Sequence, residues 1–439
     1  MIIYKFGGTS VGNAQRMKKV ASLITNDDIS KVVVLSAVSG TTNTLVEIGE
    51  LLQKRKPETA IKLIESLRND YNQLISELYD TPEAHKKGTE ILDKYFGQML
   101  SLANIPDFNL GNNKTMLAFG EILSTNLFQI YMESNNHDSQ LISALDFMTI
   151  DAEGEPEIEE IGKKLKPQLN KRLTITQGFI CRNPQGQTDN LKRGGSDYSA
   201  SIIGAAIQAE EIQIWTDIDG MHNNDPRIVK KTAPIAALTF DEAAELAYFG
   251  AKILHPASIL PAQKYKIPVR LKSTINPDAE GTLIGSKTSK RDVKAIAAKD
   301  GITAVKIKSS RMLLAYGFLK NIFEVFGHFK TPIDMVTTSE VAVSLTIDDD
   351  THLESIRTEL NKFGNVEVDI NQTIICIVGD LISEKSGILK RIFDAVSDIP
   401  VRMVSYGGSR NNISLLVDSK LKADVLNALN DGLFENVKD

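Results

Sequence analysis

Short apolar runs alternate with longer amphipathic segments over the first 286 residues of the chain. The apolar runs are rich in β-branched residues and predict strands, whereas apolar side chains spaced three or four residues apart predict helices. This alternation is typical of an α/β fold in which helices cover both faces of a mainly parallel sheet. The expected strands are residues 2–6, 31–35, 139–143, 172–176, 212–216 and 269–272, and the expected helices include 13–24, 59–79, 84–102 and 115–132. Helices 59–79 and 84–102 carry no obvious chemistry, and we expect them to form a layer beside the sheet.

The pattern changes after the polar segment at residues 285–292, where shorter strands and helices replace the long ones. Two copies of a β-α-β-β-α-β plan are expected there, over residues 293–370 and 371–439, with the leading strand of the first copy shared. The chain is thus predicted to hold one large domain, residues 1–286, and two ferredoxin-like units. The first unit is expected to contain strands 302–308, 341–347 and 366–370 and helices 321–329 and 353–363, and the second strands 373–378, 401–405 and 413–417 and helices 387–396 and 423–429.

Charge and cysteine content exclude several classes of function. The formal net charge of −6 disfavours a nucleic-acid partner, because binding to phosphate backbones needs clustered Lys and Arg. The two cysteines, Cys181 and Cys376, lie far apart in sequence and indicate neither a disulfide framework nor a zinc site. No apolar run reaches the ~18 residues of a membrane span, and Met1 opens directly into the first strand without room for a signal peptide. We therefore expect a cytoplasmic protein that binds neither nucleic acid nor membrane.

The first predicted strand carries Lys5 and stops at Gly7-Gly8, which Thr9 and Ser10 follow. Glycines let a ligand approach the backbone closely, neighbouring amides bind anions, and the following helix has a positive N-terminus. The corner therefore suits a nucleotide phosphate, although it matches neither the Walker pattern nor G-x-G-x-x-G. Taken alone, a plain glycine turn is the better explanation of this corner, so other segments have to decide.

Small and hydroxyl residues, SAVSGTTN at 36–43, follow the second predicted strand in the same manner. Ligands of doubly wound sheets bind outside the carboxyl ends of the strands, so the two corners could face one pocket, but helix capping explains the hydroxyls about equally well. Glu121 lies among apolar residues of a predicted helix, where a substrate ammonium could offset its charge. A surface glutamate is nevertheless the favoured interpretation of Glu121.

The segment Arg193-Gly194-Gly195-Ser196-Asp197 gives a sharper signal. An arginine beside two glycines can grip a carboxylate or a phosphate as a fork, whereas Ser196 or Asp197 could simply cap the next helix. A second loop of this kind in one α/β domain favours function. The loop after residues 212–216 holds carboxylates and Arg227, which suit a nucleotide or a plain turn. His255 precedes a proline, and we assign it no catalytic role.

These segments, in this order, resemble the aspartate kinase family, which has the amino acid kinase fold. The tail resembles the paired ACT regulatory domains of that family, with residues 336–340 matching the effector-site segment, so the resemblance covers nearly the whole chain. It implies phosphorylation of the β-carboxylate of L-aspartate by ATP and Mg²⁺, the entry step to lysine, threonine and methionine. The length of 439 residues fits the monofunctional form. The matching segments are residues 5–11, 176–179, 193–198, 215–217, 225–227 and 250–252.

The resemblance also implies roles for individual residues, and it assigns no protein ligand to a metal. Lys5 and Asp197 are the expected catalytic pair. Lys192 stands where the family usually has glycine, and His222 where lysine-sensitive members carry tyrosine. The expected aspartate contacts are Ser36, Thr42, Glu121, Arg193 and Ser196. The expected nucleotide contacts are Gly7, Gly8, Ser10, Thr216, Asp217, His222, Arg227 and Lys252.

An amino-acid effector and a homodimer formed through the ACT-type units are further implications of the resemblance. Lysine is the favoured effector and threonine the alternative, since Ala315 and Pro332 replace serines of the lysine-sensitive type. Another amino acid kinase, acting on glutamate or a nucleoside monophosphate, ranks second, and a non-catalytic amino-acid sensor is the alternative from another class. The expected effector contacts are Met312, Phe318, Leu319, Ile333, Asp334, Thr338, Ser339 and Glu340.

Overall fold

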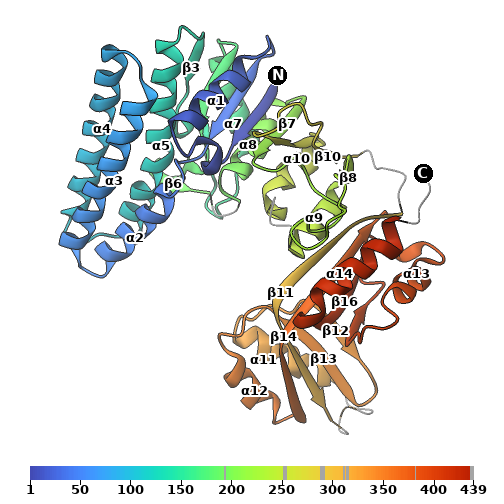
Figure 1. Cartoon of the computed structure of the whole chain (residues 1–439). Helices are drawn as coiled ribbons and strands as arrows, with labels where there is room; N and C mark the ends of the chain where they lie inside the picture. Colours follow the sequence, from blue (N-terminus) through green and yellow to red (C-terminus); the bar gives the residue numbers. More distant parts are fainter. Residues whose placement is uncertain are drawn as a thin grey trace. The chain divides into compact units, whose positions relative to one another are not determined.

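The chain forms two compact units (Figure 1), seen in a computed structural model that describes residues 1–191, 194–250, 255–286, 292–309, 312, 316–380 and 382–435. The first unit contains Met1–Met221, Ala236–Phe240 and Leu254–Lys287, and the second contains His222–Ile235, Asp241–Ile253 and Thr288–Asp439. Residues 222–235 and 241–253 thus belong to the compact unit of the tail. The domain boundaries expected from the sequence stay predictions.

The first unit is built on a sheet in which the described residues form eight strands, in the order β3-β4-β2-β1-β7-β9-β10-β8. The six strands from β3 to β9 are parallel, while β10 is antiparallel to β9 and parallel to β8. Both β2 and β4 are buried along their whole length, as continuous apolar runs predict for central parallel strands. The strands are β1 (Ile2–Phe6), β2 (Lys31–Leu35), β3 (Ser139–Leu141), β4 (Leu173–Gln177), β7 (Glu211–Thr216), β8 (Ala237–Thr239), β9 (Val269–Ser273) and β10 (Thr282–Gly285).

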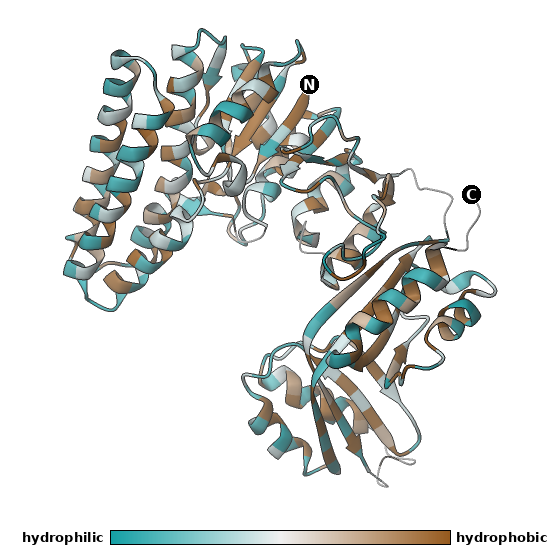
Figure 2. Ribbon diagram, viewed as in Figure 1, coloured by the Kyte–Doolittle hydropathy of each residue, from teal (hydrophilic) through white to brown (hydrophobic). Residues whose placement is uncertain are grey.

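Helices α2 to α5 form a layer beside this sheet, as Figure 1 shows. Figure 2 shows the mixed faces of α3 and α4, whose apolar side chains, such as Tyr71 and Phe96, pack into the main core. The expected layer is therefore present, and both long helices start at a proline just before the expected residue. The helices are α1 (Ala14–Thr25), α2 (Thr41–Gln53), α3 (Pro57–Leu78), α4 (Pro82–Ala103), α5 (Leu110–Ser134), α6 (Ala144–Phe147), α7 (Ile158–Leu165), α8 (Gly195–Ile207) and α10 (Leu260–Tyr265), and the hairpin strands are β5 (Ile180–Arg182) and β6 (Thr188–Asn190).

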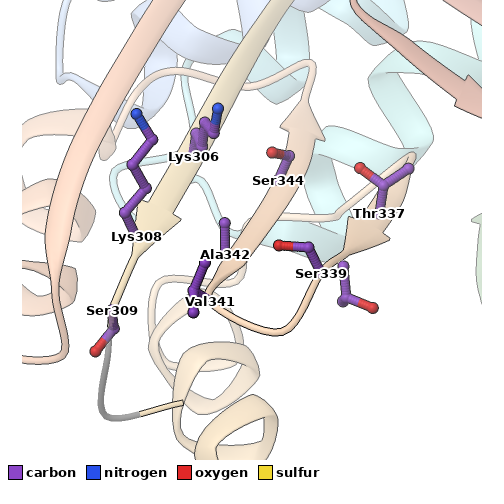
Figure 3. A pocket seen from close by; sticks show the side chains of 9 residues that line it. Lys306, Lys308, Ser309, Thr337, Ser339, Val341, Ala342 and Ser344 are labelled. Atoms are coloured by element: carbon purple, nitrogen blue, oxygen red, sulfur yellow. The ribbon is translucent and has the colours of Figure 1, made fainter. Parts of the chain in front are cut away.

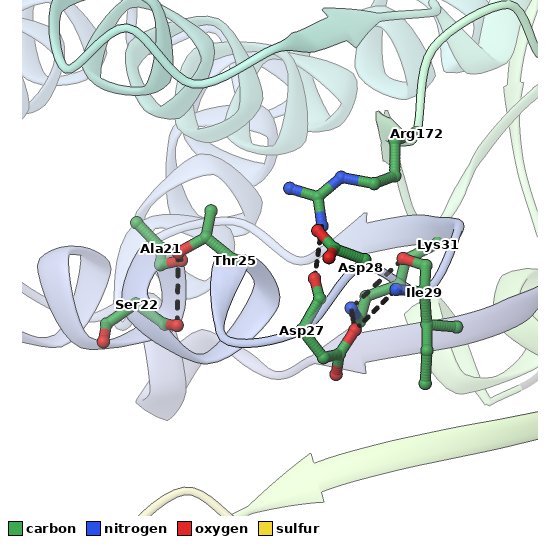
Figure 4. A network of polar contacts seen from close by, with 8 residues as sticks. All are labelled: Ala21, Ser22, Thr25, Asp27, Asp28, Ile29, Lys31 and Arg172. Atoms are coloured by element: carbon green, nitrogen blue, oxygen red, sulfur yellow. Dashed lines mark hydrogen bonds and ion pairs between the residues drawn. The ribbon is translucent and has the colours of Figure 1, made fainter.

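A closed polar network lies at the amino ends of β1, β2 and β4 (Figure 4). The side chain of Lys31 is fully buried, and its ammonium donates to the carboxylate of Asp27 and, at 3.2 Å, to the carbonyl of Ile29. It also lies 5.4 Å from the ring centroid of Tyr4. The guanidinium of Arg172 donates to the carbonyl of Asp27. This network satisfies the buried ammonium of Lys31 from several sides.

The second unit contains an antiparallel sheet in which the described residues form six strands, in the order β12-β13-β11-β14-β16-β15. Two separate cores flank its halves, one around Ile322, Phe326 and Leu345 and the other around Ile392 and Leu415. The strands are β11 (Val293–Lys308), β12 (Val336–Thr338), β13 (Ala342–Ile347), β14 (Asn365–Gly379), β15 (Met403–Ser405) and β16 (Asn412–Asp418), and the helices are α9 (Phe240–Tyr248), α11 (Phe318–His328), α12 (Leu353–Leu360), α13 (Ile388–Ala395) and α14 (Lys422–Asn430).

The two central strands, β11 and β14, pass through both halves of this sheet. Residues 302–308 of β11 pair with 365–372 of β14, and residues 293–299 pair with 374–379, with an irregular register between Lys299 and Ile302. The two strands expected at 366–370 and 373–378 are therefore one strand with a local distortion, since Asn371 has a φ of 57°. The first half of β11, residues 293–299, was not among the expected strands, and it pairs with the segment 374–379 of the second expected copy.

Candidate functional site

Lys5 and Asp197 form an ion pair at the carboxyl end of β1, with 2.7 Å between Lys5 Nζ and Asp197 Oδ1. Lys5 is the fourth residue of β1, and Asp197 lies in the first turn of α8. Their side chains are 12% and 19% exposed, so the pair is largely buried but still reachable from solvent. The structure thus brings together two residues that lie 192 positions apart in sequence.

Two glycines, Gly7 and Gly8, follow β1 at positions where neighbouring groups come close. A Cβ on Gly8 would lie 3.0 Å from the carbonyl of Ala37, and one on Gly7 would lie 3.3 Å from Lys5 Nζ. Ser10 follows in a short 3₁₀ turn, and its amide donates to the carbonyl of Gly7 at 2.9 Å. The turn expected at Gly7-Gly8 therefore holds the corner after β1 against the corner after β2.

Ser36 and Ser196 join the second corner to α8, with 2.8 Å between their hydroxyl oxygens. Room for this contact depends on Gly178, because a Cβ there would lie 2.3 Å from the Cβ of Ser196. Gly194 and Gly195 have φ values of 62° and 53°, a left-handed conformation that glycine adopts without strain. The glycines of the Arg193 segment thus set the start of α8 so that Ser196 and Asp197 face the strand ends.

Glu121 is buried in the middle of α5, with only 4% of the residue exposed. The amide of Ala37 donates to its Oε1 at 3.2 Å, whereas Oε2 is buried and has no hydrogen-bond partner among the described residues. Burial raises the pKa of Glu121 to about 7, although the Ala37 amide and the charge of Lys5 act in the opposite direction. The favoured interpretation of Glu121 as a surface residue is therefore wrong.

Residues that were not among the expected substrate or nucleotide contacts support this site. Ser124 donates to the carbonyl of Ser36 at 2.7 Å. Gln177, at the end of β4, accepts from the amide of Ala144 and donates to the hydroxyl of Thr125, both at 2.7 Å. The available signal was their polarity, since all three polar side chains lie in segments that are otherwise buried.

The two threonines at the start of α2 have opposite environments. Thr42, an expected aspartate contact, is exposed, while Thr41 is buried with its hydroxyl 3.0 Å from that of Tyr71. The site has therefore no contact to Thr42 comparable to those of Ser36 and Glu121 within the described part of the chain.

A small pocket of about 100 Å³ lies beyond the carboxyl ends of β1, β7 and β9. It brings Ser10 and Asp217 together, two of the expected nucleotide contacts, and Thr216 Oγ1 donates to Asp217 Oδ1 at 3.1 Å. Arg16 and Lys19 of α1, which the sequence did not indicate, add two cations. The pocket is lined by Thr9, Ser10, Arg16, Lys19, Val20, Asp217, Thr274 and Ile275.

Of the other expected contacts, two belong to the second unit and two fall outside the described residues. His222 and Arg227 belong to the second unit, where His222 Nδ1 lies 2.9 Å from Thr232 Oγ1. Arg227 donates to both oxygens of Asp225 at 2.9 and 2.8 Å, and these bonds lower the pKa of Asp225. Arg193 and Lys252 fall outside the described residues.

Comparison with known proteins identifies the family. Residues 1–273 match the amino acid kinase family and residues 375–433 match the ACT domain. Lysine-sensitive aspartokinase 3 of Escherichia coli is 34% identical, with 99% of each chain covered. Chloroplastic aspartokinase 1 of Arabidopsis thaliana is 35% identical, with 99% of this chain and 80% of the relative covered. The chain belongs to the aspartokinase family.

Solved aspartokinase structures have the same fold. E. coli aspartokinase III in complex with lysine and aspartate has a TM-score of 0.84 at 33% identity, with 99% of both chains covered. The aspartate kinase of Clostridium acetobutylicum has a TM-score of 0.87 at 25% identity, with 99% and 100% covered. The expected amino acid kinase fold followed by ACT-type units is thereby confirmed.

The described residues of this aspartokinase contain no group of three or more His, Cys, Asp and Glu side chains that could hold a metal ion. Mg²⁺ does not need such a cage, because it is usually bound by one or two carboxylates together with substrate phosphates and water. Asp197 and Asp217 are carboxylates of the first unit that suit this mode. Within the described residues, no helix is long and apolar enough to cross a membrane.

The expected effector residues of this aspartokinase fall into several environments. Thr338 and Ser339 line an open depression of about 570 Å³. Figure 3 shows Ser339 in it together with Lys306, Lys308 and Ser344. Asp334 has a side chain that is 1% exposed and pairs with Lys299 at 3.0 Å. Phe318 is buried in a core, Met312 and Ile333 are half-buried, and Leu319 and Glu340 are exposed.

Proposed function

We propose that this chain transfers the γ-phosphoryl group of ATP to the β-carboxylate of L-aspartate, giving 4-phospho-L-aspartate for lysine, threonine and methionine biosynthesis. The observation that carries the proposal is the Lys5–Asp197 ion pair together with the buried Glu121, whose Oε2 has no hydrogen-bond partner among the described residues. E. coli aspartokinase III, a relative at 32% identity, has been solved with aspartate and ADP. We place the reaction in the cytoplasm.

The chemistry needs fixed positive charge rather than a general base. The side chain of aspartate has a reference pKa of about 3.9 and is already ionised at neutral pH. It must therefore approach the phosphoryl group against repulsion, and the ammonium of Lys5 offsets that repulsion when it is held in place beforehand. Asp197 fixes the position of this ammonium at 2.7 Å and needs to take no proton.

The remaining substrate contacts follow from charge. Glu121 would receive the α-ammonium of aspartate on its open oxygen, because a buried anion without a partner gains most from a cation. Arg193 would bind a carboxylate, and Ser36 and Ser196 would add hydroxyl contacts at the same strand ends. Thr42, on the exposed surface of α2, is retained as an aspartate contact only as a prediction.

The nucleotide would lie along the glycine corner, where Gly7, Gly8 and Ser10 present backbone and hydroxyl groups to its phosphates. Asp217 lines the pocket beyond β7, and Thr216 donates to its carboxylate. His222, Arg227 and Lys252 are assigned to the nucleotide by resemblance. Mg²⁺, when bound with ATP, neutralises phosphate charge, and Asp197 or Asp217 would hold it or its water.

Trapping the product with hydroxylamine separates this function from its alternatives. The purified chain is incubated with ATP, Mg²⁺ and one of aspartate, glutamate or a nucleoside monophosphate, and the hydroxamate is measured. Aspartate should give the hydroxamate with ADP in equal amount. A preference for glutamate would indicate a different amino acid kinase, and ADP formation only with the nucleoside monophosphate would indicate a nucleotide kinase. The absence of any turnover would favour a non-catalytic sensor.

The tail is proposed to bind an end-product amino acid, with lysine favoured over threonine, and to join two chains in a homodimer. Support comes from the match of residues 375–433 to the ACT domain and from the lysine complex of the E. coli relative. Inhibition by lysine, threonine and methionine, alone and in pairs, identifies the effector. Light scattering at the assay concentration should give the mass of two chains, and a monomer would contradict the dimer.

A further inference from the structure

Helix α9 presents three polar side chains to the rest of the second unit, at positions 242, 245 and 248 of one helical face. Glu242 forms an ion pair with Lys294 of β11 at 2.7 Å, and both side chains are at most 1% exposed. Glu245 accepts from Ser409 Oγ at 2.6 Å and from Asn412 Nδ2 at 2.9 Å. The helix is thus fixed to the sheet of the tail along two successive turns.

The third contact, from Tyr248, reaches one of the expected effector residues. The hydroxyl of Tyr248 donates to Asp334 Oδ1 at 2.6 Å. Burial and the neighbouring carboxylate of Asp334 hold the pKa of Tyr248 well above its usual range, so the hydroxyl stays a donor. Asp334 therefore links two parts of the unit: it lies just before the effector-site segment 336–340 in the chain, and its side chain is hydrogen-bonded to α9.

One carboxylate oxygen of Asp334 could accept a further hydrogen bond. Its side chain is 1% exposed, yet Oδ2 has no hydrogen-bond partner among the described residues. Lys299 occupies the other oxygen at 3.0 Å, pairs with Asp348 at 2.8 Å, and lies 4.5 Å from the ring centroid of Tyr248. An ammonium group bound to Oδ2 would share the carboxylate of Asp334 with Tyr248 and Lys299. It would therefore change the strength of the bonds that these two residues make to Oδ1.

The segment after α9 is held closely as well. Gly250 has a φ of 114°, and a Cβ there would lie 2.1 Å from the carbonyl of Ala298 in β11. Two residues later comes Lys252, an expected nucleotide contact. A change in how Tyr248 holds the end of α9 would therefore act close to that lysine in sequence.

We propose that Tyr248 couples effector binding at Asp334 to helix α9, and so transmits inhibition toward the nucleotide-side segment that follows the helix. This inference rests on the proposed function, and it adds a positioning residue to the regulation of that site. The effector's ammonium takes the open oxygen of Asp334, and the bond from the Tyr248 hydroxyl carries the rearrangement to the helix.

The test uses Tyr248→Phe in the full-length chain, which removes the hydroxyl but keeps the ring beside Lys299. Tyr265→Phe, at a half-buried position in α10, is the matched control. In Tyr248→Phe we expect kcat and KM without effector to stay within twofold, and L-lysine binding measured by calorimetry to stay within threefold. The concentration of L-lysine for half inhibition should rise at least tenfold. A lysine response equal to that of Tyr265→Phe would overturn the proposal.

Hydrogen exchange gives a readout that does not depend on catalysis. Adding L-lysine should change the exchange of peptides covering residues 241–250 in the unmodified chain and in Tyr265→Phe, but not in Tyr248→Phe. If lysine does not bind, L-threonine replaces it as the probe. Effector binding that leaves this exchange unchanged in the unmodified chain would overturn the inference and leave the proposed kinase activity intact, whereas absent hydroxamate formation would overturn only that activity.

Discussion

Two lysine–aspartate pairs stand at opposite ends of neighbouring strands in the first unit. Lys5 pairs with Asp197 at the carboxyl end of β1, and Lys31 pairs with Asp27 at the amino end of β2. Lys31 is fully buried and is also satisfied by the Ile29 carbonyl and the ring of Tyr4. Lys5 is partly exposed, lies close to Gly7, and acts electrostatically on Glu121, whose Oε2 has no hydrogen-bond partner among the described residues. A lysine–aspartate pair therefore stabilises the fold at Lys31, where the buried ammonium is contacted from several sides. The same residue types suit chemistry at Lys5, where the pair is partly exposed.

The largest effect should come from Lys5→Ala. Loss of a preorganised positive group at the transferring phosphoryl should lower kcat by about 10²–10³-fold or more. The melting temperature should change little, because Asp197 keeps some access to water. Hydroxamate assays and thermal melting measure both, with Lys62→Ala on the exposed surface of α3 as the control. Near-normal turnover in Lys5→Ala would reject its catalytic role.

Lys31→Ala should show the reverse pattern. Removing a fully buried side chain leaves a cavity and should lower the free energy of unfolding by about 2–4 kcal/mol. Lys31→Met refills that volume without a charge to desolvate, and should cost less than about 1.5 kcal/mol. Urea unfolding can be followed through Trp215, the single tryptophan, which is buried in β7 of the same sheet. Equal losses in both variants would show that the ion pair, rather than packing, stabilises this end.

The difference between the two pairs shows which features of the first unit could be predicted from the sequence. The interruption of an apolar strand by Gly7 and Gly8 drew attention to the corner that holds Lys5, and the resemblance to a known family then assigned Lys5 its role. Lys31 carried no such signal, since a lysine at the start of a strand usually reaches solvent, and its burial depends on Asp27 and Arg172 folding over it. Local pattern therefore finds the corner of a strand, but not the partners that close a network.

The burial of Glu121 in helix α5 and the distortion of strand β14 could not be predicted from the sequence, for related reasons. Helix α5 is buried on most of its surface, so its pattern gave no exposed face on which to place Glu121. In β14 the left-handed Asn371 interrupts the alternation of a strand that nevertheless continues. Each case depends on contacts with segments far away in sequence, which periodicity does not contain.

Glu121 gives a pH test of the incomplete site. Its pKa is raised to about 7 in the folded chain, and the ionised form is needed to bind the ammonium of aspartate. Raising the pH from 6 to 8 should therefore lower the KM for aspartate by about tenfold, as the carboxyl loses its proton. Glu121→Gln should have a high KM without this pH dependence. A KM that does not change with pH in the unmodified chain would contradict the assignment.

The raised pKa of Glu121 also makes the free energy of unfolding depend on pH, and here a rise in pH is unfavourable. Because the pKa of Glu121 is higher in the folded chain than its ordinary value of 4.5, the folded state holds this proton more tightly. The resulting stabilisation is complete at low pH and is lost as the pH rises from about 4.5 to 7. Glu121→Gln, which does not titrate, should lack this component of the pH profile in urea unfolding.

The smallest effects should separate two adjacent threonines. Thr41→Val leaves the buried hydroxyl of Tyr71 without its partner and should cost about 1–2 kcal/mol of unfolding free energy, with no change in the KM for aspartate. Thr42→Val, on the exposed side of the same turn, should leave stability unchanged within about 0.5 kcal/mol. A severalfold rise in KM is expected for Thr42→Val if the position contacts aspartate, as the resemblance implies. An unchanged KM would remove Thr42 from the site, and Glu121 and the hydroxyls of Ser36 and Ser196 would remain as the polar contacts that the described residues offer there.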